Sequence, residues 1–384
     1  MNPSLDALRF RSSPHVELRR LSDLDDEARQ PFLELERDPD FHGLFVPKPP
    51  LTLNIKSVER QTAQLFLSLA TPAHLDRATL GDAANRSDLV DLVLDGFLEL
   101  EKGGRFVCGA DAFPILCPPL ASLEIRDAIG RLSRHGLVHA QDLATSSARE
   151  LTQALYFYNR VPLTPFWKAR FPARQAVLEY LGADRGALRT LLEQEWTLSS
   201  HPHANSWILW SSMAARGEGA VTYKLYVSPR PERIREVFEI LVRVLSEFPG
   251  TSFKIGDRAA GLLRPDKLVA YFAGREELDD AAGALRRQLS GCEAQGVPFT
   301  AGLDDTGLLS WGIDPPRNNR SLSWLGSESW RFWIAQRLGA ALSIGKLAQS
   351  DDAIEPWRFA VERVRRDGVL VDTWTPSPAI WSQP

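Results

Sequence analysis

A lysine and a tyrosine stand two residues apart in the run TYKLYVS, residues 222–228. The run alternates like a β-strand, so the apolar side chains of Leu225 and Val227 share one face. Lys224 and Tyr226 share the other face, and an amphipathic helical stretch begins soon afterwards. A cation and a phenol on one strand face belong either to a solvated sheet face or to an anion-binding site.

Four further cations follow on or between the next predicted strands. Lys254 lies in the strand TSFKIG, Lys267 begins the strand LVAYF, and Arg258 and Arg264 lie between them. If these strands pair with residues 222–228, the lysines converge, and convergent Lys and Arg side chains bind phosphate or carboxylate well. Burial and like-charged neighbours also lower the pKa of a lysine, which makes it a usable base. The competing interpretation is a row of surface lysines on a solvated sheet face.

Several other kinds of site are excluded by the absence of their motifs. The chain contains no GxxxxGK[ST] phosphate loop, no GxGxxG after a strand, no kinase HRD and DFG pair and no G-x-S-x-G elbow. His201 and His203 stand close together, but no third metal ligand lies near them. The three cysteines match neither a disulfide framework nor a zinc spacing. We therefore expect no metal site.

Composition narrows the cellular setting and the partners. The chain has 384 residues, a net charge of −4 and a sequence pI of about 6.0. It lacks the global basic field that drives binding to nucleic acid or to an anionic membrane. The sequence contains no apolar run of the ~18–20 residues that a membrane span needs and no signal-peptide pattern at its N-terminus. The sparse, odd number of cysteines is typical of a reducing compartment, so we predict a cytoplasmic protein.

The C-terminal half predicts an α+β domain over residues 206–384. Two helices, in residues 231–245 and 275–289, alternate with five strands. The strands are TYKLYV, TSFKIG, LVAYF, FTAGL and LLSWGI. This order favours a mixed or antiparallel sheet with packed helices. Two more helices follow, and their spacing places Trp330 and Trp333 in a core.

The N-terminal part predicts a smaller domain over residues 1–118 and a helical connecting region over residues 119–205. Residues 1–30 are polar and charged, which favours a surface helix or a partly ordered arm. A Pro-interrupted hairpin, a helix and a second helix then lead to FLELE and RFVCG, which bracket Lys102-Gly103-Gly104. That turn predicts a closing β-hairpin.

The element order of residues 40–110 resembles the winged-helix precursor-peptide recognition domains of the PqqD-like group. The resemblance implies docking of a precursor peptide, with addition of an edge strand as the physical mode. A plain winged-helix scaffold is the alternative. A DNA-reading winged helix is disfavoured, because Asp88, Asp91 and Asp95 on the helix before the hairpin would repel phosphates.

The runs TYKLYVS, FKIG, DKLVAYF and LLSWGIDPP, in this order, are similar to the phosphothreonine lyase family. That family includes type III effectors and the lyase domains of class III and IV lanthipeptide synthetases. The closing GIDPP and SLSWLGSESW also look like the HopA-type effectors and their relatives in class V lanthipeptide and thioamitide pathways. The match covers residues 220–335. It implies elimination of phosphate from phosphoserine or phosphothreonine, without a metal or an organic cofactor.

The resemblance implies roles for three residues. Lys224 would hold the substrate phosphate, Lys254 would abstract the α-proton, and Tyr226 would protonate the leaving phosphate. Lys267, Arg258 and Arg264 are further candidates for phosphate binding. The lyases carry histidine where this chain has Tyr226, and a tyrosine has a pKa near ~10 against ~6.5 for histidine. This departure places the general-acid role in question.

Three functions remain open on the sequence. The first is a lyase that makes dehydroamino acids in a ribosomal precursor peptide, which a separate kinase phosphorylates. The second is an inactive peptide-binding or scaffold subunit of a peptide-modifying complex. The feature that favours it over a lyase is Tyr226, which stands where the lyases have histidine. The third is a type III effector. The oligomeric state is not predicted.

Overall fold

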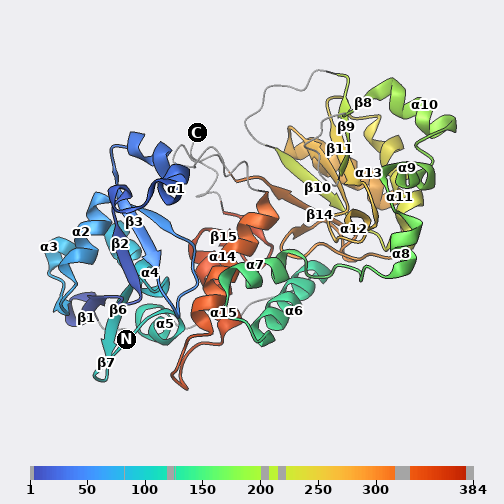
Figure 1. Ribbon diagram of the computed structural model, residues 1–384. Helices are drawn as coiled ribbons and strands as arrows, with labels where there is room; N and C mark the ends of the chain where they lie inside the picture. The colour runs from blue at the N-terminus through green and yellow to red at the C-terminus, as the bar shows by residue number, and fades with distance from the viewer. Residues whose placement is uncertain are drawn as a thin grey trace.

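The computed structural model describes residues 4–81, 83–118, 125, 127–199, 207–214, 222–315 and 329–377. It confirms the predicted α+β class, with helices packed on antiparallel sheets (Figure 1). A large sheet lies at one end of the molecule and two small sheets lie at the other. Helix α14 (Trp330–Gly345) runs between them. Within the described ranges, no helix is long and apolar enough to cross a membrane.

Seven strands form the large sheet, and every described pair is antiparallel. Their order across the sheet is β13 (Ala301–Gly302), β14 (Leu309–Ile313), β10 (Tyr223–Val227), β12 (Leu268–Phe272), β11 (Ser252–Gly256), β9 (Trp207–Ser212) and β8 (Trp196–Leu198). The strands predicted from alternation or from short apolar runs are β10 to β14. Strands β8 and β9 were missed, because β8 follows a helix without a turn signal and β9 begins with four apolar residues in a row.

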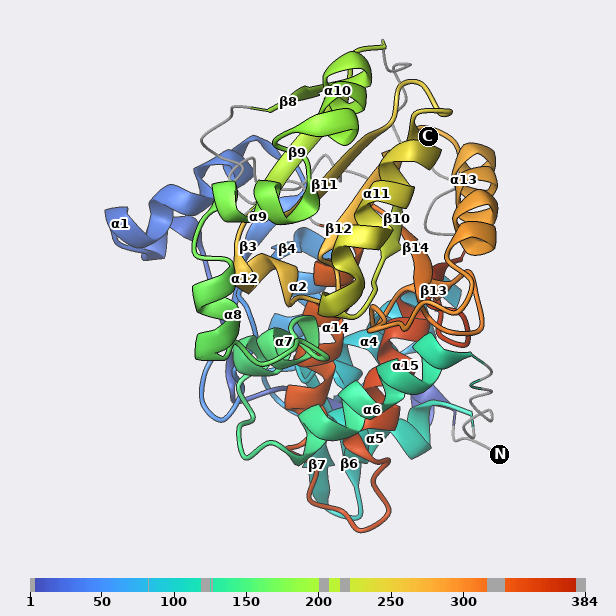
Figure 2. The ribbon, with the colours of Figure 1, turned by 90° about the vertical axis from the view of Figure 1, so that its right-hand side faces the viewer.

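One face of this sheet carries the core that the alternation predicts. Leu225, Val227 and Phe253 are fully buried on it beneath α11 (Ile234–Leu245) and α13 (Arg275–Gln288). Figure 2 shows both helices lying over the sheet. Burial of each such side chain contributes about 1.5–3 kcal/mol. Because side chains alternate across a strand, Lys224, Tyr226 and Lys254 lie on the opposite face.

The N-terminal part contains two small sheets. One has the order β5 (Ala73–His74), β1 (Arg9–Ser12), β6 (Leu98–Lys102), β7 (Arg105–Val107), and the other has the order β2 (Val16–Arg19), β3 (Phe41–Pro47), β4 (Lys56–Glu59). Gly103 and Gly104 join β6 to β7 with φ of 57° and 80°, which is the left-handed geometry of a tight hairpin turn. The predicted closing hairpin is therefore confirmed.

The first thirty residues differ from their prediction as a surface helix or loose arm. Strand β1 lies between β5 and β6, and its Phe10 is fully buried. Strand β2 pairs with β3. The charged composition concealed these strands, because Phe10 is the one buried residue among the four of β1. Helix α1 (Asp26–Arg29) and the 3₁₀ helix η3 (Gln30–Arg37) follow them.

Helices complete the middle and the end of the chain. They are α2 (Arg60–Ser68), α3 (Arg77–Leu80), α4 (Ala83–Leu94), α5 (Gly109–Leu116), α6 (Ala128–Asp142), α7 (Ala148–Tyr156), α8 (Pro165–Arg170), α9 (Arg174–Leu181), α10 (Gly186–Glu195), α12 (Ala259–Leu262) and α15 (Pro356–Arg366). Trp330 and Trp333 of α14 are buried, as predicted, in a core that also contains Phe10 and Phe97. Helices α14 and α15 thus share the core of the N-terminal sheets, and the first turn of α14 reaches the large sheet.

Candidate phosphate-binding site on the large sheet

The structure brings Lys224 and Lys254 together on the face of the large sheet opposite α11 and α13. They lie on β10 and β11, which flank β12 on either side. Lys224 pairs in register with Tyr271, and Lys254 pairs with Val269. Both ammonium Nζ atoms lie 5.6 Å from the centroid of the same Tyr271 ring. The two predicted lysines therefore belong to one site.

Lys224 is held by the segment that follows β14. Its side chain is buried, and its Nζ lies 2.5 Å from Oδ1 of Asp314. The same Oδ1 accepts a hydrogen bond of 3.3 Å from the backbone N–H of Trp330, at the start of α14. Gly312 pairs with Lys224 across the strands, and a Cβ there would lie only 2.8 Å from the Trp330 indole. Glycine at this position lets α14 approach the lysine.

Lys254 is partly exposed. Its Nζ lies 4.3 Å from the centroid of the Trp207 ring, on β9. Burial, and then the positive charges of Lys224 and Arg264, lower its pKa to about 8, although Asp266 and Asp314 act in the opposite direction. Among the described residues, no carboxylate forms an ion pair with this ammonium group. Lys254 can therefore lose its proton near neutral pH while it still faces solvent.

Two arginines lie beside the lysines and share one carboxylate. Arg264 donates from Nε and Nη2 to the two oxygens of Asp266, each over 2.8 Å. Arg331, on α14, is almost fully buried and places Nη1 2.7 Å from Oδ2 of Asp266. Both guanidinium groups lie over the Tyr156 ring, and Arg264 also lies 5.2 Å from the centroid of the Trp207 ring. The aromatic rings connect the arginines to Lys254.

Asp266 stays ionised because of these arginines. Burial alone would raise its pKa, but Arg331 and Arg264 together hold it below the usual range. The site thus contains four cations, Lys224, Lys254, Arg264 and Arg331, against the two carboxylates Asp266 and Asp314. With Lys254 protonated, two positive charges are left over. That surplus equals the charge of a phosphate monoester dianion.

Tyr226 lies on the same strand face but is buried among Val269, Val297 and Tyr271. Burial raises its pKa well above 10, and the nearby Arg331 only partly opposes this effect. The phenol therefore keeps its proton at neutral pH and is a weak proton donor to a leaving phosphate.

The other two predicted phosphate ligands have local partners. Lys267 is fully buried and donates to the carbonyl oxygen of Pro229 over 2.8 Å and to Oε1 of Gln295 over 2.6 Å. Burial lowers its pKa to about 7. Arg258 is more than half exposed and bonds to Asp257. In the described part of the chain, neither Lys267 nor Arg258 contacts the four clustered cations. Arg264, which was predicted as a phosphate ligand together with them, is one of those four cations.

Sequence reasoning missed several members of the site. Arg331 was not predicted as a site residue, because it lies in the largely apolar helical run WRFWIAQRL. The charge of its side chain was the only feature of the sequence that could have indicated a role in the site. Asp314 stands in GIDPP, and Asp266 directly precedes the predicted ligand Lys267. No local pattern connects these residues, because their proximity arises from strand pairing. The pair His201 and His203 lies outside the described residues.

No protein-family model matches the chain, and no curated protein matches it. Among solved structures, an effector protein from Pseudomonas syringae pv. tomato strain DC3000 is similar with a TM-score of 0.38 and 12% identity, over 65% of this chain and 98% of that one. The type III effector and phosphothreonine lyase OspF from Shigella flexneri has a TM-score of 0.28 and 13% identity, over 53% and 98% of the two chains. The phosphothreonine lyase effector VirA (SpvC) of Chromobacterium violaceum has a TM-score of 0.27 and 15% identity, over 37% and 77%.

Proposed function

We propose that this protein eliminates phosphate from phosphoserine or phosphothreonine in a peptide and leaves a dehydroamino acid. The observation that carries the proposal is the cluster of four cations and two carboxylates on one sheet face, in which Lys254 has its pKa lowered to about 8. With Lys254 protonated, the surplus of two positive charges attracts a phosphate dianion; when Lys254 is the neutral base, Lys224, Arg264 and Arg331 still leave a surplus of one. Because the cations are already fixed by neighbours, they need little reorganisation when a phosphate arrives.

The reaction follows from the placement of Lys254. Its neutral amine takes the α-proton of the phosphorylated residue, and the electron pair of that C–H bond forms the Cα=Cβ double bond. The Cβ–O bond breaks, and the phosphate leaves with its oxygen and the bonding electrons. Lys224, Arg264 and Arg331 stabilise the charge on the leaving phosphate. No oxidation state changes and no co-reactant is consumed.

The substrate must come from a kinase reaction, because elimination consumes a phosphate ester of a serine or threonine side chain. We propose a ribosomally made precursor peptide of the lanthipeptide or thioamitide kind as the substrate and a separate kinase as the partner. The N-terminal domain, residues 1–118, would hold part of that peptide. The division into residues 1–118, 119–205 and 206–384 belongs to the same proposal.

The direct test is incubation of the protein with phosphoserine and phosphothreonine peptides, followed by mass spectrometry. We expect the product to lose the mass of phosphoric acid and to react with a thiol, which adds to the new double bond. Hydrolysis by a contaminating phosphatase gives a different mass and no thiol adduct. Intact phosphopeptides after incubation with a set of varied sequences would contradict the enzymatic proposal.

A second function, phosphopeptide binding without turnover, is favoured by one observation. Tyr226 is buried and its pKa is raised well above 10. It is therefore a weak proton donor to the leaving phosphate. The cation cluster would then hold the phosphate without expelling it. The protein would serve as a recognition subunit of a peptide-modifying complex.

Substitution of Tyr226 separates the two functions. If the parent protein only binds phosphopeptides, Tyr226→His should produce elimination at least ~10-fold above the background measured with the parent protein, since a positioned general acid contributes about 100- to 10,000-fold. If the tyrosine is already a working acid, Tyr226→Phe should instead lower the rate by about 100-fold. Phosphopeptide affinity, measured by isothermal titration calorimetry, should be unchanged in both variants and thereby serves as the control for folding.

A further inference from the structure

A row of cations and aromatic rings leads away from Lys254 at the phosphate site. The Trp207 ring, which contacts Lys254, also lies 5.2 Å from the guanidinium carbon of Arg264. That carbon lies 5.5 Å from the centroid of the Phe157 ring, and the guanidinium carbon of Arg160 lies 5.8 Å from the same centroid. All five residues are at least partly exposed. A peptide whose phosphate reaches Arg264 can therefore extend past Phe157 to Arg160.

Arg160 has hydrogen-bonding capacity that the protein does not use. Its Nη2 donates to the carbonyl oxygen of Ala260 over 3.1 Å, and its Nε is buried without a hydrogen-bond partner. In the described part of the chain, Nη1 has no hydrogen-bond partner and no carboxylate forms an ion pair with this guanidinium group. A cation that is partly buried and lacks a counter-charge is costly, and a carboxylate from a ligand would remove that cost.

The backbone on both sides of Arg160 is fixed by hydrogen bonds. Asn159 has a φ of 64°, in the left-handed region, and its Nδ2 donates to the carbonyl oxygen of Gln295 over 2.5 Å. On the other side, the backbone N–H of Val161 donates to the carbonyl oxygen of Leu263 over 3.0 Å. A left-handed conformation outside glycine persists where the surroundings hold it, and such residues cluster at functional sites. Arg160 is therefore presented by a fixed loop.

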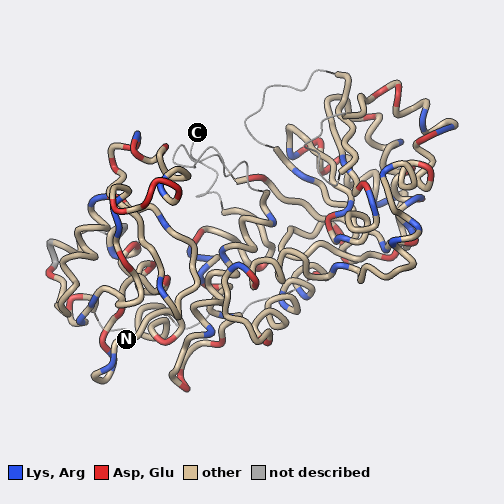
Figure 3. Tube along the Cα trace, in the orientation of Figure 1, with Lys and Arg blue, Asp and Glu red and all other residues tan. Residues whose placement is uncertain are grey.

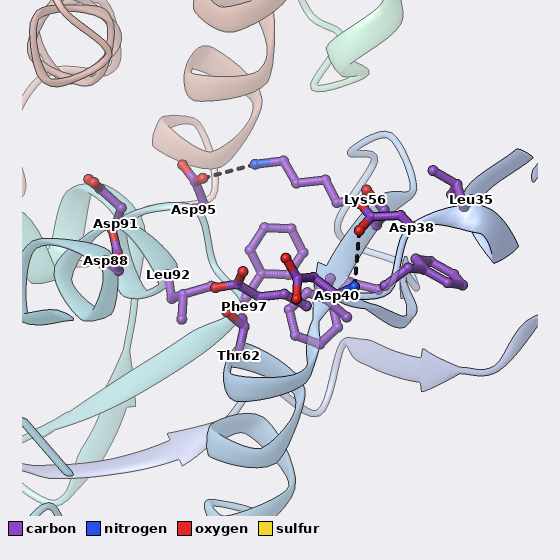
Figure 4. A pocket seen from close by; sticks show the side chains of 15 residues that line it. Leu35, Asp38, Asp40, Lys56, Thr62, Asp88, Asp91, Leu92, Asp95 and Phe97 are labelled. Atoms are coloured by element: carbon purple, nitrogen blue, oxygen red, sulfur yellow. Dashed lines mark hydrogen bonds and ion pairs between the residues drawn. The ribbon is translucent and has the colours of Figure 1, made fainter. Parts of the chain in front are cut away.

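The groove between strand β4 and helix α4 shows a different use of charge. Carboxylates line it from two sides, among them Asp40 and Asp88 (Figure 4). Lys56 is the one cation among its lining residues, and its Nζ already lies 3.0 Å from Oδ2 of Asp95. Figure 3 shows further acidic residues along α1 and η3, at the same end of the molecule. Among its described lining residues, this groove offers no unpaired cation to an acidic peptide, whereas Arg160 does.

We propose that Arg160 binds an aspartate or glutamate side chain of the substrate peptide. This inference rests on the proposed function, because it takes the phosphate of the same peptide to lie beside Arg264. An extended chain advances about 3.3–3.6 Å per residue, so the acidic residue stands about two or three positions from the phosphorylated one. Arg160 adds one positive charge, which equals the charge of one carboxylate, and its planar donors match the two carboxylate oxygens. The residue between them contacts Phe157.

The preference can be measured by fluorescence anisotropy with the full chain and fluorescein-labelled phosphoserine peptides. A single glutamate is moved through the positions on either side of the phosphoserine, and each peptide has a partner with glutamine at that position. We expect glutamate at one position to bind about tenfold more tightly than glutamine. Arg160→Met should abolish this ratio and leave the affinity for the glutamine peptide unchanged, which also shows that the variant is folded.

Two further variants sharpen the test. Arg185→Met makes the same change in net charge at a side chain that is 84% exposed, and it should keep the full preference. Arg160→Glu should reverse the preference, so that lysine at the same position binds more tightly than glutamate. Equal affinities for every glutamate and glutamine pair, or a preference that survives in Arg160→Met, would overturn the assignment to Arg160. A lack of binding to all the phosphopeptides would overturn it as well.

The same peptides separate this inference from the proposed elimination. Loss of phosphoric acid from each peptide is followed by mass spectrometry in parallel with binding. A tenfold preference for glutamate without any elimination would contradict the lyase function and leave the role of Arg160 intact. Elimination at equal rates and equal affinities from the glutamate and glutamine peptides would support the lyase function and contradict the role of Arg160.

Discussion

Replacement of Lys254 by methionine should lower kcat for phosphate elimination by about 100- to 10,000-fold, the usual contribution of a general base. The reason is that Lys254 is the cation of the site that combines solvent exposure with a pKa lowered to about 8. Lys254→Arg should lose kcat to the same extent but keep KM close to the parent value, because arginine retains the charge and cannot give up its proton. The exposed Lys168→Met, on α8, is the matched control and should keep full activity.

The pH profile of the parent protein gives an independent check. The neutral amine is the active form, so kcat/KM should rise with pH, pass its midpoint near pH 8 and level off above it. The second ionisation of a phosphate ester lies near ~6, so it affects a different part of the profile. A midpoint near 6 without one near 8, or full turnover by Lys254→Arg, would show that Lys254 is not the base.

Replacement of Asp266 by asparagine should lower the free energy of unfolding by about 3–5 kcal/mol, the typical cost of breaking a buried ion pair. Asp266 neutralises Arg264 and Arg331, and all three side chains are largely buried. The variant leaves two buried guanidinium groups with no carboxylate at this position. Urea unfolding followed by circular dichroism measures the loss. The exposed ion pair between Arg275 and Asp279 on α13 supplies the control. Asp279→Asn should lower the free energy of unfolding by less than about 1 kcal/mol.

The pH dependence of the unfolding free energy tests whether the charge of Asp266 causes the loss in Asp266→Asn. Because the pKa of Asp266 is lowered on folding, its contribution is complete above its unfolded pKa of about 4 and is lost as pH falls below that value. The difference in unfolding free energy between parent and variant should therefore be constant above about pH 5 and shrink in acid. Adding Arg331→Met to Asp266→Asn should recover part of the loss. A loss that is independent of pH, or no recovery, would point to packing rather than charge.

Local patterns in the sequence determined most of the large sheet. Strands β10, β11, β12 and β14 follow from alternating or short apolar runs, and α11 follows from a helical apolar stripe. The same period of two placed Lys224 and Tyr226 on one face, since neighbouring side chains of a strand point in opposite directions. Strands β1 and β9 escaped detection, because charge in one and continuous apolarity in the other conceal the period.

Only the tertiary structure decided which cations meet. Lys254 and Lys267 both stood on predicted strands, yet the first lies beside Lys224 and the second donates to Pro229 and Gln295. Arg331 reaches Asp266 across 65 positions of sequence through the packing of α14, which no local pattern encodes. Side-chain periodicity is a property of neighbouring residues, so the sequence alone determined which residues share a strand face. The order of strands and the docking of a distant helix depend on contacts across the whole chain, and these contacts assemble the charges of the site.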